Sequence, residues 1–364
     1  MRKHWARHRW RLLPHSCHGI ARAKHVSPQR TGNQAPSGTS SVTPYVGQIG
    51  SLVLAIGTAH VDRPRAEAAC VDAQDISLTF ETADGRVDAL SLKSEYGDDA
   101  RFLAGGQSLI PTMNFRLARP SVLIDINGLK DLAGVDRSDT AHVRVGALTR
   151  YRDLERDGDF LRCCPLFADA LPHIAHPQIR NRGTIGGNLS HADPASELPA
   201  LAVAMQARMR IKSSTGEREV PASEFFMGLL TTDIGSDEML VEIAYPARKP
   251  RTGTCFQEVA RRRGDFALAG VAAMVTLDEK RRCTGIRLAL CGVGETPVDA
   301  SEAVGSLIGT DCNDEAIGAV AAEVQDIIEP SGNVHATPDY QRHIAGVLAR
   351  RTLSTAFQRA GHGV

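Results

Sequence analysis

The chain has 364 residues, of which 42% are hydrophobic and 23% are charged. These values are typical of a globular protein, and the length allows two or three domains with a sizeable core. Aromatic residues make up only 5%, which argues against a nucleic-acid surface built on base stacking. Basic and acidic residues number 42 each, but residues 1–61 contain eight basic residues and no acidic one. The rest carries 34 basic against 42 acidic residues, and this net charge of −8 also disfavours nucleic acid as a partner.

The N-terminal region differs in composition from the rest of the chain. It is rich in arginine, contains serine and lacks acidic residues, which is typical of an organelle transit peptide. Its apolar run, residues 52–56, is too short to span a bilayer, and we expect no membrane span. We interpret residues 1–75 as a basic extension that is disordered or arises from an artefactual gene start. The alternative is a basic arm that docks on partner subunits.

The first motif is the glycine-rich stretch Ala104–Ser108, which follows a predicted strand end at residues 102–104. Its paired glycines permit positive φ and close approach by a ligand. We expect Ser108 to cap a helix that begins near Leu109, and the free N–H groups of a helix start suit a phosphate. A buried strand is predicted over residues 122–126. The alternative for this motif is an ordinary turn followed by a capped helix.

A second glycine-rich stretch, Thr184–Asn188, lies about eighty residues further on. Side chains of this stretch and Ser190 add donors to the glycine amides. Asp193 followed by proline predicts a helix start, with Glu197 one turn in, where a carboxylate can accept from ribose hydroxyls. The alternative for Glu197 is favourable placement of a negative charge near a helix N-terminus. Two such loops in one chain indicate a pyrophosphate held from both sides, as in a flavin dinucleotide.

The remaining pattern predicts mostly strands, followed by two helices at the C-terminal end. Strands are predicted over residues 142–147, 209–211 and 239–243, and a linker rich in proline, glycine and basic residues over 245–253. Apolar stretches at 270–277 and 286–290 are read as strands of an antiparallel sheet, before helices near 313–328 and 338–358.

Cysteines and histidines give no metal motif. The eight cysteines are Cys17, Cys70, Cys163, Cys164, Cys255, Cys283, Cys291 and Cys312. None forms the short Cys-x-x-Cys spacing that iron–sulfur clusters and structural zinc normally need, so we expect reduced, buried thiols and no cluster on this chain. His173, His176 and His191 lack a well-placed third ligand, and hydrogen bonding or solvent exposure explains them more simply than a metal site.

Several of these segments together resemble one known family. They are AGGQSLIP at 104–111, RLARP at 116–120, LIDI at 123–126, RNRGTIGGN at 180–188, HADPAS at 191–196 and RRRGDFA at 261–267. In this combination and order the chain resembles the FAD-binding (medium) subunit of the molybdenum hydroxylases, the relatives of xanthine dehydrogenase and aerobic carbon monoxide dehydrogenase. The resemblance runs from about residue 85 to about residue 355.

The resemblance implies an α+β fold. A two-part FAD-binding domain of the PCMH (vanillyl-alcohol-oxidase-like) type is expected over residues 76–246, with subdomains of about 76–140 and 141–246. A smaller α+β C-terminal domain with an antiparallel sheet is expected over residues 254–355.

The resemblance also implies the residues that bind FAD without a covalent bond. In the first loop they are Leu103, Ala104, Gly105, Gly106, Gln107, Ser108, Leu109 and Ile110, and in the second Thr184, Ile185, Gly186, Gly187 and Asn188. Beyond the loops they are Asp193, Glu197, Leu240, Asp265 and Phe266. Glu197 falls where the family usually has an aspartate near the adenosine. Ile174 stands where some relatives have an aromatic residue, and Gln257 lies near the position of a lysine in others.

The function implied is electron transfer, with no catalytic acid, base or metal ligand on this chain. A cytoplasmic heterotrimer is expected, with a large molybdopterin-binding subunit and a small subunit carrying [2Fe–2S] clusters. The FAD would pass electrons to an external acceptor. The alternatives are a self-sufficient FAD-dependent oxidoreductase and a non-catalytic assembly protein that keeps the fold. The substrate and the acceptor stay open.

Overall fold

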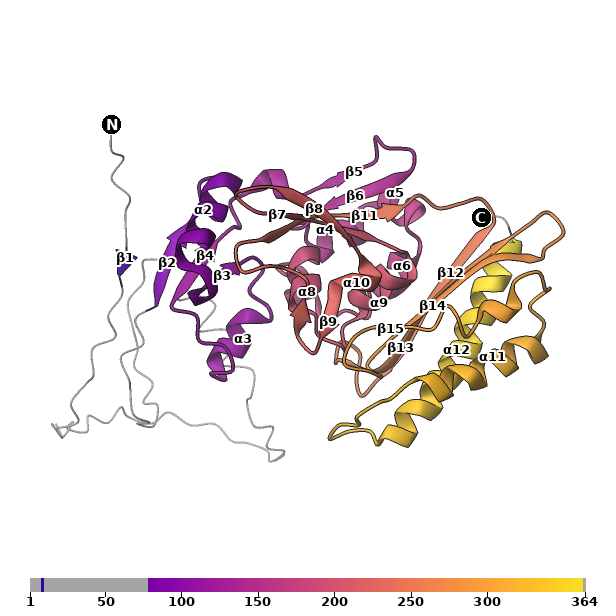
Figure 1. Cartoon of the computed structure of the whole chain (residues 1–364). Helices are drawn as coiled ribbons and strands as arrows, with labels where there is room; N and C mark the ends of the chain where they lie inside the picture. The colour runs from indigo at the N-terminus through magenta and orange to yellow at the C-terminus, as the bar shows by residue number, and fades with distance from the viewer. Residues whose placement is uncertain (1–7, 10–77, 363–364) are drawn as a thin grey trace, which may run out of the picture. The chain divides into compact units, whose positions relative to one another are not determined.

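The computed structural model describes residues 8–9 and 78–362 (Figure 1). The expected basic extension over residues 1–75 lies outside the described residues, except for the two-residue strand β1 (His8–Arg9). No helix in the described ranges is long and apolar enough to cross a membrane.

The first sheet carries the first glycine-rich loop. Its strand order is β1-β2-β4-β3, with β2 (Thr79–Thr82) and β3 (Ala100–Leu103) both parallel to β4 (Val122–Asp125). Helix α3 (Leu109–Asn114) connects β3 to β4 and completes the βαβ unit. The loop therefore lies at the carboxyl end of a parallel strand, the usual place for a ligand in such a unit.

The segment before β3 has no counterpart among the predicted elements. It contains β2 and helix α2 (Arg86–Tyr96), followed by a 3-10 turn at Gly97–Asp99. Helix α2 buries only Ala89, Leu90 and Lys93. One of its three buried positions is thus a lysine, so the apolar stripe that usually reveals a helix is weak here.

The second sheet is antiparallel, with the order β5-β6-β11-β7-β8. Its strands are β5 (Val135–Asp136), β6 (His142–Gly146), β7 (Arg208–Lys212), β8 (Glu217–Pro221) and β11 (Met239–Pro246). The connection from β6 to β7 holds α4 (Tyr151–Arg156), α5 (Gly158–Cys163), α6 (Leu166–Ala170), α7 (Pro177–Arg180), α8 (Ile185–His191) and α9 (Glu197–Ala204). After β8 follow α10 (Ala222–Phe225) and the hairpin of β9 (Phe226–Gly228) and β10 (Thr231–Thr232).

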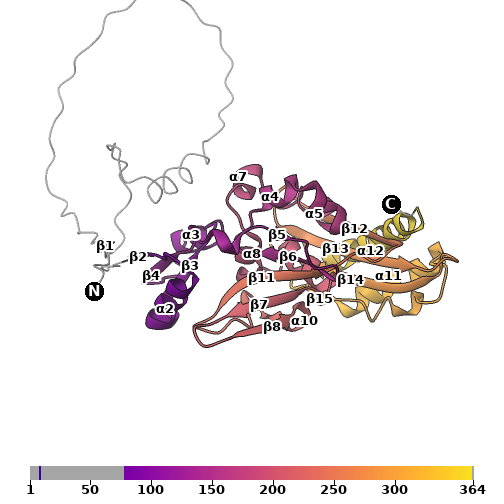
Figure 2. The same cartoon turned by 90° about the horizontal axis from the view of Figure 1, so that it is seen from above.

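The third sheet is the antiparallel one expected near the C-terminus. Its order is β12-β13-β14-β15, and its strands are β12 (Thr252–Ala260), β13 (Ala267–Leu277), β14 (Cys283–Cys291) and β15 (Val298–Asp299). Helices α11 (Asp314–Ile327) and α12 (Pro338–Gly361) follow and cover one face of this sheet in both views (Figures 1 and 2).

The opposite face of the third sheet packs against the helices that connect β6 to β7. Phe256, Ala272, Ala289 and Cys291 belong to the same buried cluster as residues of helices α4, α5, α6, α8 and α9. Neighbouring residues whose side chains point to the other face, such as Val271 and Leu288, belong to the cluster formed with α11 and α12. The third sheet is therefore buried on both faces, which explains its nearly continuous apolar strands.

Two of the differences between predicted and observed boundaries bear on the site and on the domain organisation. Helix α9 begins at Glu197 and has Ser196 as its N-cap residue, whereas the sequence pattern predicts a start at Asp193. The Asp193 carboxylate instead accepts a hydrogen bond from the Ala195 N–H at 2.9 Å, a local turn that competes with helix initiation. The predicted linker over 245–253 is shorter, because β11 extends to Pro246 and β12 begins at Thr252.

Candidate cofactor-binding site

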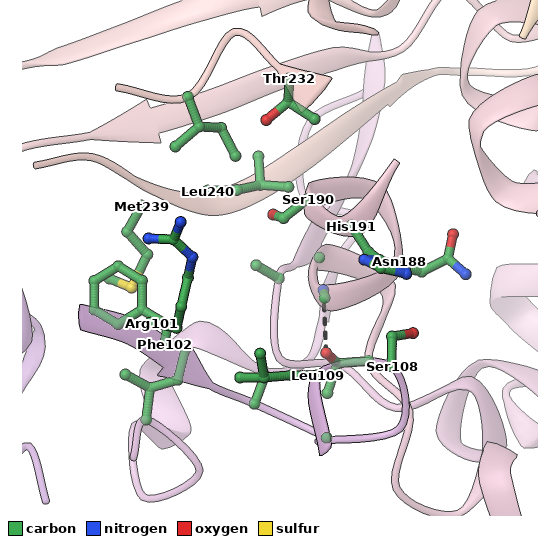
Figure 3. Close-up of a pocket in the computed structure, with 18 of the residues that line it drawn as sticks. Arg101, Phe102, Ser108, Leu109, Asn188, Ser190, His191, Thr232, Met239 and Leu240 are labelled. Atoms are coloured by element: carbon green, nitrogen blue, oxygen red, sulfur yellow. Dashed lines mark hydrogen bonds between the residues drawn. The ribbon is translucent and has the colours of Figure 1, made fainter. Parts of the chain in front are cut away.

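The site is a cavity of about 600 Å³, lined by residues of the first sheet and its loops and by residues between β6 and β11. Three of the segments that line it are the loop from β3 to α3, the loop that enters α8, and the stretch from Leu230 to Leu240 before and within β11. In Figure 3, Ser108 and Leu109 of the first loop lie on one side, and Thr232, Met239 and Leu240 lie opposite. Segments distant in the sequence thus converge on one pocket.

The first loop presents a row of unused donors. None of the five N–H groups from Gly105 to Leu109 donates a hydrogen bond to a described residue. Gly106 has φ +70°, a value that favours glycine. The expected side-chain cap by Ser108 is wrong: Ser108 occupies the N-cap position of α3, but its hydroxyl caps no N–H group. The five N–H groups and this hydroxyl all belong to residues that line the cavity, an arrangement that suits an anion.

A side chain outside the motif holds this loop in place. The Asn127 amide donates to the carbonyl oxygens of Leu103 at 3.1 Å and Ala104 at 2.7 Å. Its own oxygen accepts from Arg150 at 3.4 Å. Since these bonds satisfy carbonyls at the end of β3, the loop is fixed with its N–H groups left free.

In the second loop most backbone N–H groups are already bonded, and the glycines let the backbone pack closely against its neighbours. The N–H of Ile185 donates to the Thr149 carbonyl at 3.0 Å, and that of Gly186 donates to the Ala147 carbonyl at 2.8 Å. A side chain at Gly186 would overlap Ala147, so only glycine fits there. Thr184 caps α8, its hydroxyl accepting from the Gly187 N–H at 3.2 Å. The two loops therefore differ: the first offers amides, and the second offers a capped helix start.

Eleven of the eighteen residues predicted to bind the cofactor line the cavity. They are Ala104, Gly105, Gly106, Gln107, Ser108, Leu109, Thr184, Gly186, Gly187, Asn188 and Leu240. The other seven are not among the lining residues: Leu103, Ile110, Ile185, Asp193, Glu197, Asp265 and Phe266. Of these, Phe266 is 65% exposed, and Asp265 accepts from Arg261 at 3.2 Å. Their roles toward a cofactor stay predictions.

Several residues that line the cavity belong to no motif that predicts a binding site. Lys93, Asp98 and Arg101 line the cavity from the first region. Lys93 donates to the carbonyl oxygens of Gly97 at 2.6 Å and Ala100 at 3.0 Å, and burial lowers its pKa. The segment 230–240 also stands outside any motif, apart from Leu240. Only the resemblance had placed Leu240 beside the cofactor.

Histidines near the site are not arranged as metal ligands. His191 lines the cavity, and burial lowers its pKa. His173 lies 3.2 Å from the Glu258 carboxylate, measured from Nδ1 to Oε1. Within residues 78–362, no group of three or more histidine, cysteine or acidic side chains has the geometry to hold a metal ion.

Comparison with known proteins gives the class to which this fold and pocket belong. A family model described as the FAD binding domain in molybdopterin dehydrogenase matches residues 78–248, and one described as the CO dehydrogenase flavoprotein C-terminal domain matches residues 254–356. The chain therefore belongs to the family of FAD-binding medium subunits of molybdenum hydroxylases.

Individual relatives support this assignment. The 6-hydroxypseudooxynicotine dehydrogenase complex subunit alpha of Paenarthrobacter nicotinovorans is 39% identical over 78% of this chain and 96% of its own length. The carbon monoxide dehydrogenase medium chain of Hydrogenophaga pseudoflava is 37% identical over 75% of this chain and 94% of its own. A solved carbon monoxide dehydrogenase from the same organism has a TM-score of 0.75 at 36% identity, covering 77% of this chain and 97% of that chain.

These findings confirm the resemblance, the α+β fold with its C-terminal antiparallel sheet, and the assignment to a flavoprotein subunit of an oxidoreductase. Electron transfer by bound FAD is the role that fits the family, whose members belong to multi-subunit molybdenum enzymes. The molybdenum cofactor and the iron–sulfur clusters belong to the other subunits in this family.

Proposed function

We propose that this chain binds FAD non-covalently in the cavity and passes electrons from a small iron–sulfur subunit to an external acceptor. A large molybdopterin-binding subunit completes the complex, which is expected in the cytoplasm. The observation that carries the proposal is the row of five N–H groups from Gly105 to Leu109, which belong to cavity-lining residues and donate to no described residue.

The residues present fit the diphosphate of FAD. Free backbone donors bind phosphate oxygens without the entropy loss of long side chains. The Thr184 hydroxyl, which accepts from the Gly187 N–H, also lines the cavity and has an O–H to donate. A side chain at Gly105 would overlap the Arg182 carbonyl, so the two loops meet with no side chain between them. We assign diphosphate binding to residues 105–109 and support from the second loop to Thr184 and Gly187.

Apolar residues are available for the rest of the cofactor. Leu109, Leu117, Leu230, Leu240 and Met239 line the same cavity. When bound, FAD supplies one- and two-electron chemistry, and the protein supplies position, exclusion of water and electrostatic tuning. No residue of this chain is assigned to bond-making on a substrate.

The substrate is decided elsewhere in the complex. Relatives that are 39%, 37% and 37% identical to this chain are named for 6-hydroxypseudooxynicotine, caffeine and carbon monoxide. Such different substrates with similar medium subunits imply that the substrate pocket belongs to another subunit. No observation favours a self-sufficient oxidoreductase or an assembly protein.

The test is binding of FAD to the purified full chain. We expect flavin absorbance to remain with the protein after gel filtration and calorimetry to give one site per chain. Co-expression with the large and small subunits should give a stable complex. A folded chain that shows no heat of association with FAD would overturn the proposal.

A further inference from the structure

One arginine links the edge of the second sheet to a wall of the cofactor cavity. The wall is the stretch 230–240, most of whose residues line the cavity, Thr232, Met239 and Leu240 among them (Figure 3). Arg218 lies on the edge strand β8 and is not itself a lining residue. It pairs in register with Ile211 of β7, which in turn pairs with Leu240 of β11. The strand register therefore brings Arg218 level with the point where the wall enters the sheet.

The Arg218 guanidinium binds two carboxylates of this wall. Its Nε donates to Glu238 Oε1 at 2.8 Å, and a terminal nitrogen donates to Oε2 at 2.7 Å. The other terminal nitrogen donates to Asp233 Oδ2 at 2.6 Å, and the Asp233 carbonyl oxygen also accepts from Arg218. Because the guanidinium is a planar fork with five donors, one side chain bridges both ends of residues 233–238.

The bridged stretch has few other restraints. The Asp233 N–H donates to the Phe225 carbonyl oxygen at 2.9 Å. From residue 234 to residue 238, no backbone N–H donates to a described residue outside the stretch. The Gly235 N–H donates to Glu238 Oε2 at 2.7 Å, and the Glu238 N–H donates to the Gly235 carbonyl oxygen at 3.1 Å. The carboxylate that closes this turn is therefore the one that Arg218 holds.

The beginning of the wall is exposed and strained. Leu229 and Leu230 are 57% and 50% exposed, so the tip of the β9–β10 hairpin has little packing to fix it. Leu230, which lines the cavity, has φ +54°, in the left-handed region that residues with a side chain rarely adopt. Such a backbone persists only where nearby contacts determine it. Asp233, three residues further on, is where Arg218 supplies such a contact.

The same ion pair controls charge at the cavity. Glu238 lines the cavity, and its hydrogen bonds from Arg218 lower its pKa, so this carboxylate is ionised. Without Arg218 an unpaired negative charge would belong to a cavity in which a diphosphate is expected, and like charges repel. Loss of Arg218 therefore acts on the site through both the shape of the wall and its charge.

We propose that Arg218 is a positioning residue for the cofactor: by bridging Asp233 and Glu238 it holds the wall 230–240 in the shape that receives FAD, without touching the ligand. The inference rests on the proposed function, because FAD is the ligand expected in the cavity. A wall that is ordered in only a fraction of the molecules raises the apparent Kd for FAD by the inverse of that fraction.

The first experiment needs no cofactor. Hydrogen exchange of the full chain, followed by mass spectrometry, reports on the bonded amides of Asp233, Gly235 and Glu238. In Arg218→Met these amides should exchange about fivefold faster, because exchange follows the opened fraction, while β12, β13 and β14 stay as protected as before. Arg208→Met is the matched control. It breaks the exposed pair of Arg208 with Glu219, which also joins β7 to β8 but has no link to the cavity, and should leave the wall unchanged.

The second experiment measures FAD affinity of the same variants by calorimetry. Arg218→Met should raise Kd about fivefold, and Arg208→Met should leave it unchanged. Arg218→Lys keeps the charge, but its single ammonium group cannot bridge both carboxylates as the fork does, so its Kd should lie between those of Arg218→Met and the unmodified chain. In the unmodified chain, added FAD should slow exchange of the wall amides further.

The outcomes separate this inference from the proposed function. If no chain binds FAD, the proposed function fails, and the exchange data still decide whether Arg218 orders the wall. If exchange in Arg218→Met rises evenly over the whole chain, Arg218 serves general stability and the inference is overturned. It is equally overturned if the wall exchanges as in the unmodified chain, or if the wall opens while FAD affinity stays the same.

Discussion

Gly105 lies directly against the backbone carbonyl of Arg182, so the two glycine-rich loops touch where they border the cavity. A Cβ atom built on Gly105 would overlap the Arg182 carbonyl oxygen and carbon. This contact joins the parallel sheet to the loop that enters α8, and it sets the distance between the free amides of one loop and the capped helix of the other.

Replacing Gly105 should therefore separate the loops. We expect Gly105→Ala to lower the free energy of unfolding by about 1–3 kcal/mol, since backbone atoms have to shift to admit the methyl group. FAD affinity should fall at least tenfold, about 1.4 kcal/mol, measured by calorimetry. Gly128→Ala is the control, because nothing lies within 4 Å of a Cβ atom at Gly128. Equal affinities for the two variants would show that the contact does not shape the site.

Thr184 gives a separate test of the second loop. Its hydroxyl caps α8 by accepting from the Gly187 N–H. Loss of such a cap costs about 0.5–2 kcal/mol, so Thr184→Ala should lower both the melting temperature and the FAD affinity. Thr184→Ser keeps the hydroxyl and should restore both. If serine and alanine behave alike, the methyl group and not the cap is important.

The glycine-rich loops were predictable from sequence because their signal is local. Paired glycines with a serine or threonine two positions after or before them act within five residues, and most residues of both loops line the cavity. Lys93 and the segment 230–240 could not be found in this way. Lys93 belongs to helix α2, whose apolar pattern is weak. The segment 230–240 reaches the cavity only because the fold brings it to a loop more than a hundred positions earlier in the chain.

Glu197 shows how one helix boundary changes the interpretation of a residue. The spacing after Asp193 predicted a carboxylate one turn into a helix and close to the cofactor. The structure starts α9 at Glu197 itself, because Asp193 is used in a turn, and the side chain is buried near Glu258 on the third sheet. Helix start signals in sequence are accurate to a few residues, and a shift of that size rotates a side chain to another face.

Gln341 is predicted to be important for the C-terminal domain. This buried residue of α12 donates to the carbonyl oxygens of Leu268 and Gly292, both at 2.8 Å. Gln341→Met keeps the volume but leaves two carbonyls without this donor, which should cost about 2–4 kcal/mol in urea unfolding. Gln358→Met, at an exposed position of the same helix, should cost less than about 0.5 kcal/mol. Similar losses in both variants would mean that methionine disturbs the helix generally.

The stability of the chain should depend on pH through Glu197. Its pKa is raised by burial from 4.5 to about 8 in the folded state. Between these two values the folded chain binds more protons at this site than the unfolded chain does, so the contribution to stability is complete below about pH 4.5 and is lost as the pH rises through 8. The slope for one proton approaches about 1.4 kcal/mol per pH unit. Glu197→Gln cannot ionise and should match the unmodified chain near pH 4, then exceed its free energy of unfolding increasingly as the pH rises from about 4.5 toward 8. Urea titrations at four pH values measure this difference, with Glu219→Gln as the control. Parallel curves for the unmodified chain and Glu197→Gln would mean that Glu197 stays ionised in the folded protein.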